Sequence, residues 1–231
     1  MRKCKVFLEI ILLWFGLLSG CSAQKDIDSM TTSDAVRCVQ QVLEEISDKA
    51  VHTMEKTTIT YPEGIDTVEI ERWYEDDNCL YVGKQSNGIT TTRLQYRGEV
   101  YTKTSVNESW AKTEDTDAFF PFGVNGDRNT IEQFSESAIT SWKVENEEYC
   151  AVFDLPLKED TQNYTENQIM FYFSTKWELL RVVTHAEYTM ESWLDGNSKE
   201  IISDMVIEYQ DTSTKQIKKQ IKSAYETIVL P

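Results

Sequence analysis

Apolar and polar residues alternate along this chain with two different periods, and the change of period marks the predicted elements. Over residues 33–49 apolar side chains recur at helical spacing, with Ser33 as the expected N-cap. They form one face of an amphipathic helix: Val36, Val39, Val42, Leu43 and Ile46. From residue 51 the period is two, which is typical of strands. Turn residues separate the expected strands at 57–61, 67–74, 79–84, 90–96, 99–104 and around Trp110.

The second half of the chain resumes this strand pattern after an interruption. The run Phe119-Phe120-Pro121-Phe122 contains a proline that excludes regular alternation, and Asn129 with Glu132 predicts a short helix through about residue 137. A polar excursion is expected at 158–167 and a lysine-rich helix at 215–227. The later strands are expected at 139–144, 149–155, 168–174, 178–190 and 201–209. This order predicts an α+β domain built on one strongly curved antiparallel sheet.

The first 21 residues have the pattern of an export signal. Three basic residues precede an apolar run at residues 6–18, and Leu18-Ser19-Gly20-Cys21 ends the segment. Three outcomes are open for such a segment: lipidation of Cys21, plain secretion, or retention as a membrane anchor. The apolar run spans about 20 Å as a helix, which is shorter than the ~30 Å hydrocarbon core, and Glu9 interrupts it. A retained anchor is therefore disfavoured.

Leu18-Ser19-Gly20-Cys21 resembles the lipobox of bacterial lipoproteins. The resemblance implies that residues 1–20 are a signal peptide and that Cys21 carries the diacylglyceryl thioether and palmitate that anchor the protein to a membrane. Residues 21–32 are then the anchor and tether, and residues 33–231 form a single domain. The expected location is the outer face of the cytoplasmic membrane of a bacterial cell envelope.

The charge of the chain limits its partners. Its 23 Lys+Arg and 39 Asp+Glu residues give a formal net charge of −16. The predicted leader holds three basic residues and one acidic residue, so the remainder has 20 against 38 and a charge of −18. This field repels nucleic acid and anionic headgroups, so we expect no nucleic-acid partner. Solubility accounts for the acidity, and attraction of a cationic partner is the alternative. A hydrophobic share of 40% excludes disorder.

No catalytic or metal-binding pattern stands out, so we expect no enzyme, no cofactor and no metal. His52 and His185 are the two histidines of the chain, and neither has companion ligands at close spacing. Part of a calcium-loop spacing occurs at residues 125–136, but Thr130 stands where that loop requires glycine.

Three cysteines remain besides Cys4 of the leader and the lipidated Cys21. They are Cys38, Cys79 and Cys150, and the odd number allows at most one disulfide within the domain. Either Cys79 and Cys150 are paired or these cysteines are buried free thiols.

Several aromatic motifs are similar to those of lipoprotein carriers of the LolA and LppX type. They are Tyr96-x-Gly98-x-x-Tyr101-x-Lys103, Trp110-x-Lys112, a hairpin at 169–183 with Trp177 after its turn, and Met205-x-Ile207-x-Tyr209. The resemblance implies an incomplete barrel, or half-barrel, whose concave apolar face is capped by the N-terminal helix and the insert and holds a lipid or another hydrophobic ligand.

On this resemblance the cavity of the half-barrel is lined by apolar side chains from the helix and the strands. The expected lining residues are Val42, Ile46, Ile70, Leu80, Val82, Leu94, Tyr96, Phe171 and Phe173, and the expected lid is Phe119, Phe120 and Phe122. The alternative is that the lining residues pack as an ordinary core. Two functions follow: a ligand-binding lipoprotein, or a non-catalytic sensor module that binds an envelope protein.

Overall fold

The protein is described by a computed structural model over residues 31–47, 49–113, 139–145, 148–154, 158–159, 162–176, 178–191 and 198–229. Four features expected from the sequence lie outside these residues: the leader, Cys21, the lid at residues 119–122 and the helix at residues 129–137. Neither helix in the described part of the chain is long and apolar enough to cross a membrane.

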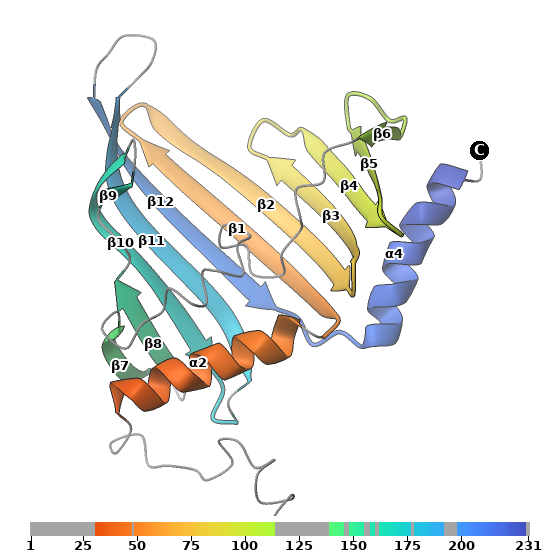
Figure 1. The fold of residues 1–231 in the computed structure, drawn as a ribbon. Coiled ribbons are helices and arrows are strands. Elements are labelled where there is room, and N and C mark those ends of the chain that lie inside the picture. Colours follow the sequence, from red (N-terminus) through yellow and green to blue (C-terminus); the bar gives the residue numbers. More distant parts are fainter. Residues whose placement is uncertain are drawn as a thin grey trace, which may run out of the picture.

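A single antiparallel sheet contains the described strands, and two helices lie against it (Figure 1). Helix α2 (Thr32–Ser47) precedes the sheet and helix α4 (Thr214–Val229) follows it. The first half supplies β1 (Val51–Tyr61), β2 (Gly64–Glu75), β3 (Asn78–Gln85), β4 (Thr90–Tyr96), β5 (Glu99–Thr104) and β6 (Ala111–Thr113). The second half supplies β7 (Ile139–Glu145), β8 (Glu148–Asp154), β9 (Lys158–Glu159), β10 (Gln162–Phe173), β11 (Leu179–Glu191) and β12 (Ser198–Tyr209).

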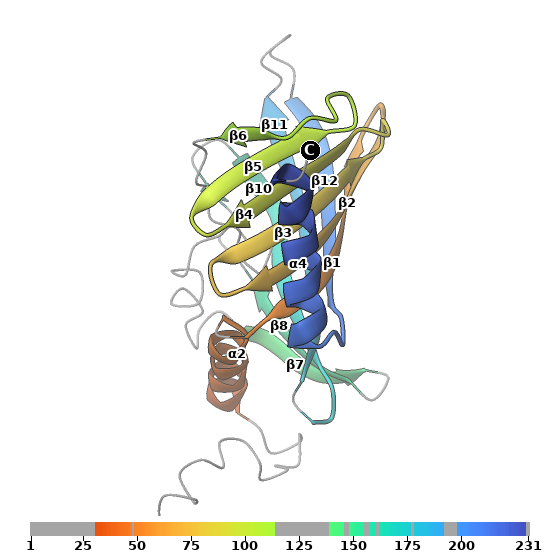
Figure 2. The same ribbon diagram turned by 90° about the vertical axis from the view of Figure 1, so that its right-hand side faces the viewer.

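The pairing of β1 with β12 joins the two halves into one sheet. The strand order is β6-β5-β4-β3-β2-β1-β12-β11-β10-β8-β7, and β9 pairs with β10. Strands β6 and β7 stand at opposite ends of this order, so the sheet is not closed into a barrel. Its curvature is visible in Figures 1 and 2. The expected α+β fold, with an amphipathic N-terminal helix, an antiparallel sheet and a C-terminal helix, is confirmed.

The two helices cover opposite faces of the sheet. Helix α2 lies on the concave side, whereas α4 lies against the outside of the wing formed by β2, β3 and β4 (Figures 1 and 2). Strand register agrees with this view. Ile207 packs beneath α2, and its cross-strand partner is Glu55. Trp73 packs beneath α4, and its partner is His52, which is three residues from Glu55 and therefore on the other face.

Helix α4 is held to the convex face by apolar contacts and by a capped first turn. Trp73, Leu80 and Leu94 of the sheet are buried against Ile217 and Ile221 of the helix. Ser213, the residue before α4, donates from its hydroxyl and from its amide to Gln216 Oε1, at 2.6 and 3.1 Å, and its carbonyl accepts from the Gln216 amide at 2.9 Å.

The lead into α4 is also fixed to the sheet. The imidazole of His52 contacts the Thr212 hydroxyl at 2.8 Å and the Glu71 carboxylate at 2.9 Å, and its ring stacks on Trp73 with centroids 4.9 Å apart. His52 therefore ties the segment before α4 to β1 and β2.

Two details of the sequence-based prediction were wrong. The N-cap of α2 is Thr31 rather than Ser33: the Asp34 amide donates to the Thr31 hydroxyl at 3.2 Å, and the Asp34 carboxylate accepts from the Thr31 amide at 3.1 Å. The reciprocal pair needs an acceptor three residues after the cap, which Thr31 has in Asp34.

The polar excursion expected at residues 158–167 is largely strand, since β9 and the first part of β10 occupy it. Its backbone pairs with β11 from Asn163 onward, so long-range hydrogen bonds override the polar composition of this segment. Strand β12 likewise begins at Ser198, earlier than the expected start at residue 201.

Packing of α4 on the convex face can be tested at Ile217, which is fully buried. Ile217→Ala should lower the free energy of unfolding by about 2–5 kcal/mol, the usual range for truncating a buried isoleucine. Denaturant unfolding followed by tryptophan fluorescence measures the change. The matched control is Lys219→Ala, at an exposed position of the same helix, for which a change within about 0.5 kcal/mol is expected. Equal effects of the two substitutions would contradict the packing of α4.

Candidate functional site

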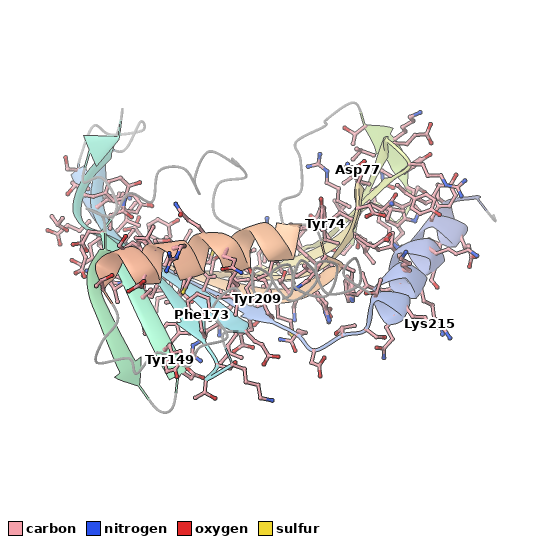
Figure 3. The ribbon with its side chains drawn as sticks, turned by 60° about the horizontal axis from the view of Figure 1, so that its bottom comes forward. Tyr74, Asp77, Tyr149, Phe173, Tyr209 and Lys215 are labelled. Carbon is pink, nitrogen blue, oxygen red and sulfur yellow. The ribbon has the colours of Figure 1, made fainter. Side chains whose placement is uncertain are left out.

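The part of the concave face beneath α2 is a packed apolar cluster. It contains Val36 and Val39 of the helix and large side chains of the sheet: Tyr149, Phe153, Ile169, Phe171, Phe173, Leu179, Val182 and Ile207. The rings of Phe153 and Phe171 meet edge to face with centroids 5.6 Å apart. Bulky sheet side chains thus fill the space between α2 and the strands. Figure 3 labels Tyr149 and Phe173 of this cluster and Tyr209, which packs against it.

The structure brings together four of the nine expected lining residues on the concave side. Phe171 and Phe173 belong to the apolar cluster, and Val42 and Ile46 of α2 pack against it. Ile70 is half-buried and pairs with Glu55, so it lies on the concave face. It belongs to β2 and is not part of the apolar cluster beneath α2.

The other four expected lining residues lie on the convex side of the sheet. Leu80 and Leu94 are buried beneath α4, and Val82 and Tyr96 pack against the same cluster. They do not line the concave face. The reason is physical: alternation shows which residues of one strand share a face, but not which face curves inward.

Polar side chains of three neighbouring strands meet on the floor of the concave face. They are Thr53 and Glu55 of β1, Arg72 of β2 and Tyr209 of β12, here called the polar cluster. Thr53 is directly opposite both Arg72 and Tyr209 in the strand register. Arg72 Nη1 lies 2.9 Å from Glu55 Oε2, and these two side chains are 13% and 6% exposed.

The polar cluster is incompletely hydrogen-bonded within the described residues. The hydroxyls of Thr53 and Tyr209 are buried there and have no hydrogen-bond partner. The ion-paired atoms of Arg72 and Glu55 are close but not aligned as a hydrogen bond. Because an unsatisfied buried polar atom costs about 1–3 kcal/mol, this cluster is suited to bonding a polar group that enters the concave side.

The two hydroxyl groups of the polar cluster, those of Thr53 and Tyr209, are neutral. Burial raises the pKa of Tyr209, and the positive charge of Arg72 opposes this shift. The pKa of the neighbouring Tyr81 is raised mainly by burial, and Arg72 stands 5.7 Å from the centre of its ring. Neutral hydroxyls donate hydrogen bonds, so Tyr209 provides a donor beside a neutralised ion pair.

The polar cluster was not predicted from the sequence, although the alternation of β1 and β2 places a charged residue at an inward position of each strand. Arg72 lies in phase with Ile70 and Tyr74, and Glu55 lies in phase with Val51 and Thr53. A charged residue at an inward position of each of two adjacent strands suggests an inward ion pair.

A cavity of about 240 Å³ lies between the last turns of α2 and the sheet. Its apolar walls include Val42, Ile46, Val51 and Leu179, and Tyr209 connects it to the polar cluster. Polar residues complete the lining: Lys49, His52, Glu178 and Gln210. The volume is slightly below the roughly 300 Å³ typical of the smallest ligand pockets. The cavity therefore fits a small molecule or one end of a longer chain.

A larger depression of about 610 Å³, here called the convex trough, lies over β12, β1, β2 and β3. Its lining includes the apolar residues Met54, Val82 and Val206. Charged residues also line it: Lys56, Glu69, Glu71, Lys84, Asp204 and Glu208. Met54 is 48% exposed, so the trough presents accessible apolar surface.

In the described part of the chain, Cys38, Cys79 and Cys150 are buried and form no disulfide. Cys79 on β3 and Cys150 on β8 are separated by several strands in the sheet, so no disulfide joins them. Burial raises the pKa of the Cys79 thiol to about 12, although Arg72 and Arg93 oppose the shift. Cys79 is therefore a structural residue rather than a nucleophile.

Comparison with known proteins does not identify a family. No family model matches the chain. No curated protein matches it either. Solved structures share only a weak likeness with it, and two of them illustrate this. One is a DUF1329 family protein from Desulfovibrio piger, 11% identical, with a TM-score of 0.31 over 79% of this chain and 92% of that chain. The other is an S-type phycobiliprotein lyase from Guillardia theta, 6% identical, with a TM-score of 0.31 over 83% of this chain and 99% of that chain. Likenesses of this size assign no function.

A double-mutant cycle tests the ion pair of the polar cluster. Glu55→Gln and Arg72→Met should each lower the free energy of unfolding by about 3–5 kcal/mol, because either one leaves a buried charge without its partner. The double variant should lose less than the sum of the two, which denaturant unfolding measures. Strict additivity would show that the two side chains do not interact.

Proposed function

We propose that this protein is a non-catalytic, membrane-anchored lipoprotein that binds a lipid or another hydrophobic ligand on the concave side of its sheet. The observation that carries this proposal is the cavity beside α2, where apolar walls adjoin buried polar groups. Ligand sites characteristically combine apolar walls with a few fixed polar groups. The proposed site binds the apolar part of the ligand between Val42, Ile46 and Leu179, and its polar part at Tyr209.

The charges of the site favour a ligand with a neutral or zwitterionic polar group. Glu55 neutralises Arg72 at 2.9 Å, so the polar cluster offers hydrogen bonds without a net positive charge. The whole chain carries a formal charge of −16, which disfavours the approach of an anionic molecule. A carbonyl, ester or amide group is the chemistry that the Tyr209 and Thr53 hydroxyls best match.

The anchor of the proposed lipoprotein is Cys21 at the outer face of the cytoplasmic membrane. Residues 22–31 separate Cys21 from α2, and a segment of that length reaches at most about 35 Å when extended. The acidic domain is repelled by anionic headgroups, so the tether holds it away from the bilayer.

A second function, binding of an envelope protein, is favoured by one observation on the other face. The convex trough combines accessible Met54 with charged residues of both signs. Exposed apolar surface with a polar rim is a common feature of protein-binding surfaces.

Native mass spectrometry of residues 22–231 tests ligand binding. The gently purified protein should carry an adduct that solvent extraction identifies as a lipid or another hydrophobic molecule. Val42→Phe enlarges a side chain of the cavity wall and should reduce adduct occupancy several-fold. Met54→Phe is the matched control on the opposite face and should leave occupancy unchanged. A clean apo mass that persists after incubation with membrane lipids would contradict ligand binding and favour the protein-binding function.

Anchoring is tested separately by Cys21→Ser in a bacterial host. The substitution removes the thiol that would carry the diacylglyceryl group, so the protein should leave the membrane fraction. Cell fractionation with immunodetection measures its distribution, and Cys4→Ser within the leader is the control that should leave anchoring intact. A Cys21→Ser protein that stays in the membrane fraction would overturn the lipobox assignment.

A further inference from the structure

Three side chains that can ligate a metal ion lie together on the convex face, over β10 and β11. They are Glu166, His185 and Glu187, and their ligand atoms lie within 4.8 Å of one another. Glu166 is directly opposite Glu187, and His185 precedes Glu187 by two residues on the same strand. Glu166 pairs in the same register as Asn167 and Gln168, and two-residue alternation from Gln168, the partner of His185, places Glu166 on the face that His185 and Glu187 share.

A fourth residue, Asp204 of β12, orients the imidazole of His185. His185 Nδ1 lies 2.6 Å from Asp204 Oδ1, and since an ionised carboxylate only accepts hydrogen bonds, Nδ1 is the donor. The other nitrogen, Nε2, then faces Glu166 Oε2 at 3.9 Å and Glu187 Oε1 at 3.7 Å. Both distances are too long for a hydrogen bond. Histidines that bind metals characteristically donate their second ring nitrogen to a carboxylate in this way.

The charges around His185 are not balanced by the described protein. Glu166 and Glu187 are like charges directly opposite each other, an arrangement that destabilises a sheet, and Asp204 adds a third carboxylate. Within the described residues, His185 is the one basic side chain at ion-pair distance from Glu166 or Glu187. A protonated imidazole supplies one positive charge against three carboxylates. A divalent cation bound to the neutral imidazole supplies two.

The geometry requires only a small contraction to hold such an ion. Bonds of about 2.0–2.2 Å from Zn²⁺ to nitrogen and oxygen place tetrahedral ligand atoms about 3.4 Å apart. The Nε2 to carboxylate distances are 3.7 and 3.9 Å. The side chains of Glu166 and Glu187 are 44% and 43% exposed, so both have room to turn inward.

We propose that Glu166, His185 and Glu187 bind a divalent transition-metal ion, that Zn²⁺ is the best match, and that Asp204 positions His185. One imidazole nitrogen and two carboxylate oxygens are donors that Zn²⁺ accepts, and water completes the coordination. Where Nε2 carries a proton, binding releases that proton to solvent. The site clamps β10 to β11 and, through Asp204, to β12. It is independent of the ligand site proposed on the concave side.

The test is a titration of the full chain, purified in mild detergent and stripped of metal with a chelator. Zn²⁺ binding is measured by calorimetry, and Co²⁺ absorption reports the ligand type. We expect saturable one-to-one binding and a Co²⁺ spectrum without a thiolate charge-transfer band. His185→Gln and Glu187→Gln should each weaken binding at least tenfold, and Asp204→Asn should weaken it about 10–100-fold through the orientation of His185. Glu226→Gln, at an exposed position of α4, is the control and should leave Zn²⁺ binding unchanged.

Three results would overturn the proposal. They are the absence of saturable binding, binding that these substitutions do not weaken, and a thiolate band that places Co²⁺ on a cysteine instead. Circular dichroism of each variant shows whether it is folded. If His185→Gln does not fold, Glu187→Gln decides, since that side chain lies on the surface of the sheet.

Discussion

Strands β1 and β12 pair from Thr53 opposite Tyr209 to Thr60 opposite Ile202, and this antiparallel contact joins two meanders that are far apart in the sequence. Loop-closure entropy opposes such a contact, so the apolar clusters on both faces must stabilise it. The polar cluster and the convex trough both depend on it. The polar cluster sets Tyr209 of β12 beside Thr53 of β1, and the convex trough crosses the same seam from Met54 to Val206.

The opposite placement of the two helices decides how the faces differ. Helix α4 covers the convex side of the β2–β4 wing, where Trp73, Leu80 and Leu94 form a closed core with Ile217 and Ile221. Helix α2 covers the concave side near β8 and β10 and leaves a cavity at its last turns. A sheet covered by helices on both sides normally has two closed cores, so the incomplete cover at the end of α2 is what provides space for a ligand.

Buried and exposed charges have different consequences in this acidic chain. On the concave floor, Glu55 and Arg72 neutralise each other, and burial raises the pKa of the neighbouring Tyr209 further above neutral pH. On the convex face, carboxylates gather around His185 without such a partner in the described residues. The first arrangement suits a neutral polar group, and the second suits a cation.

The sequence by itself determined the elements of this fold, because local periodicity and turn residues are sufficient to define them. Both helices, the first meander and the β7–β8 and β10–β11 hairpins could be read from alternation and from turns such as Arg97-Gly98, where both residues have positive φ. Only the tertiary structure decided which strands are neighbours and which face is concave. In the folded sheet, Leu80 and Phe171 lie on opposite faces, and Glu55 forms an ion pair with Arg72. Glu166, His185 and Asp204, which belong to three different strands, lie close together. A period of two places residues on the faces of one strand, whereas curvature and long-range pairing arise from the packing of the whole sheet.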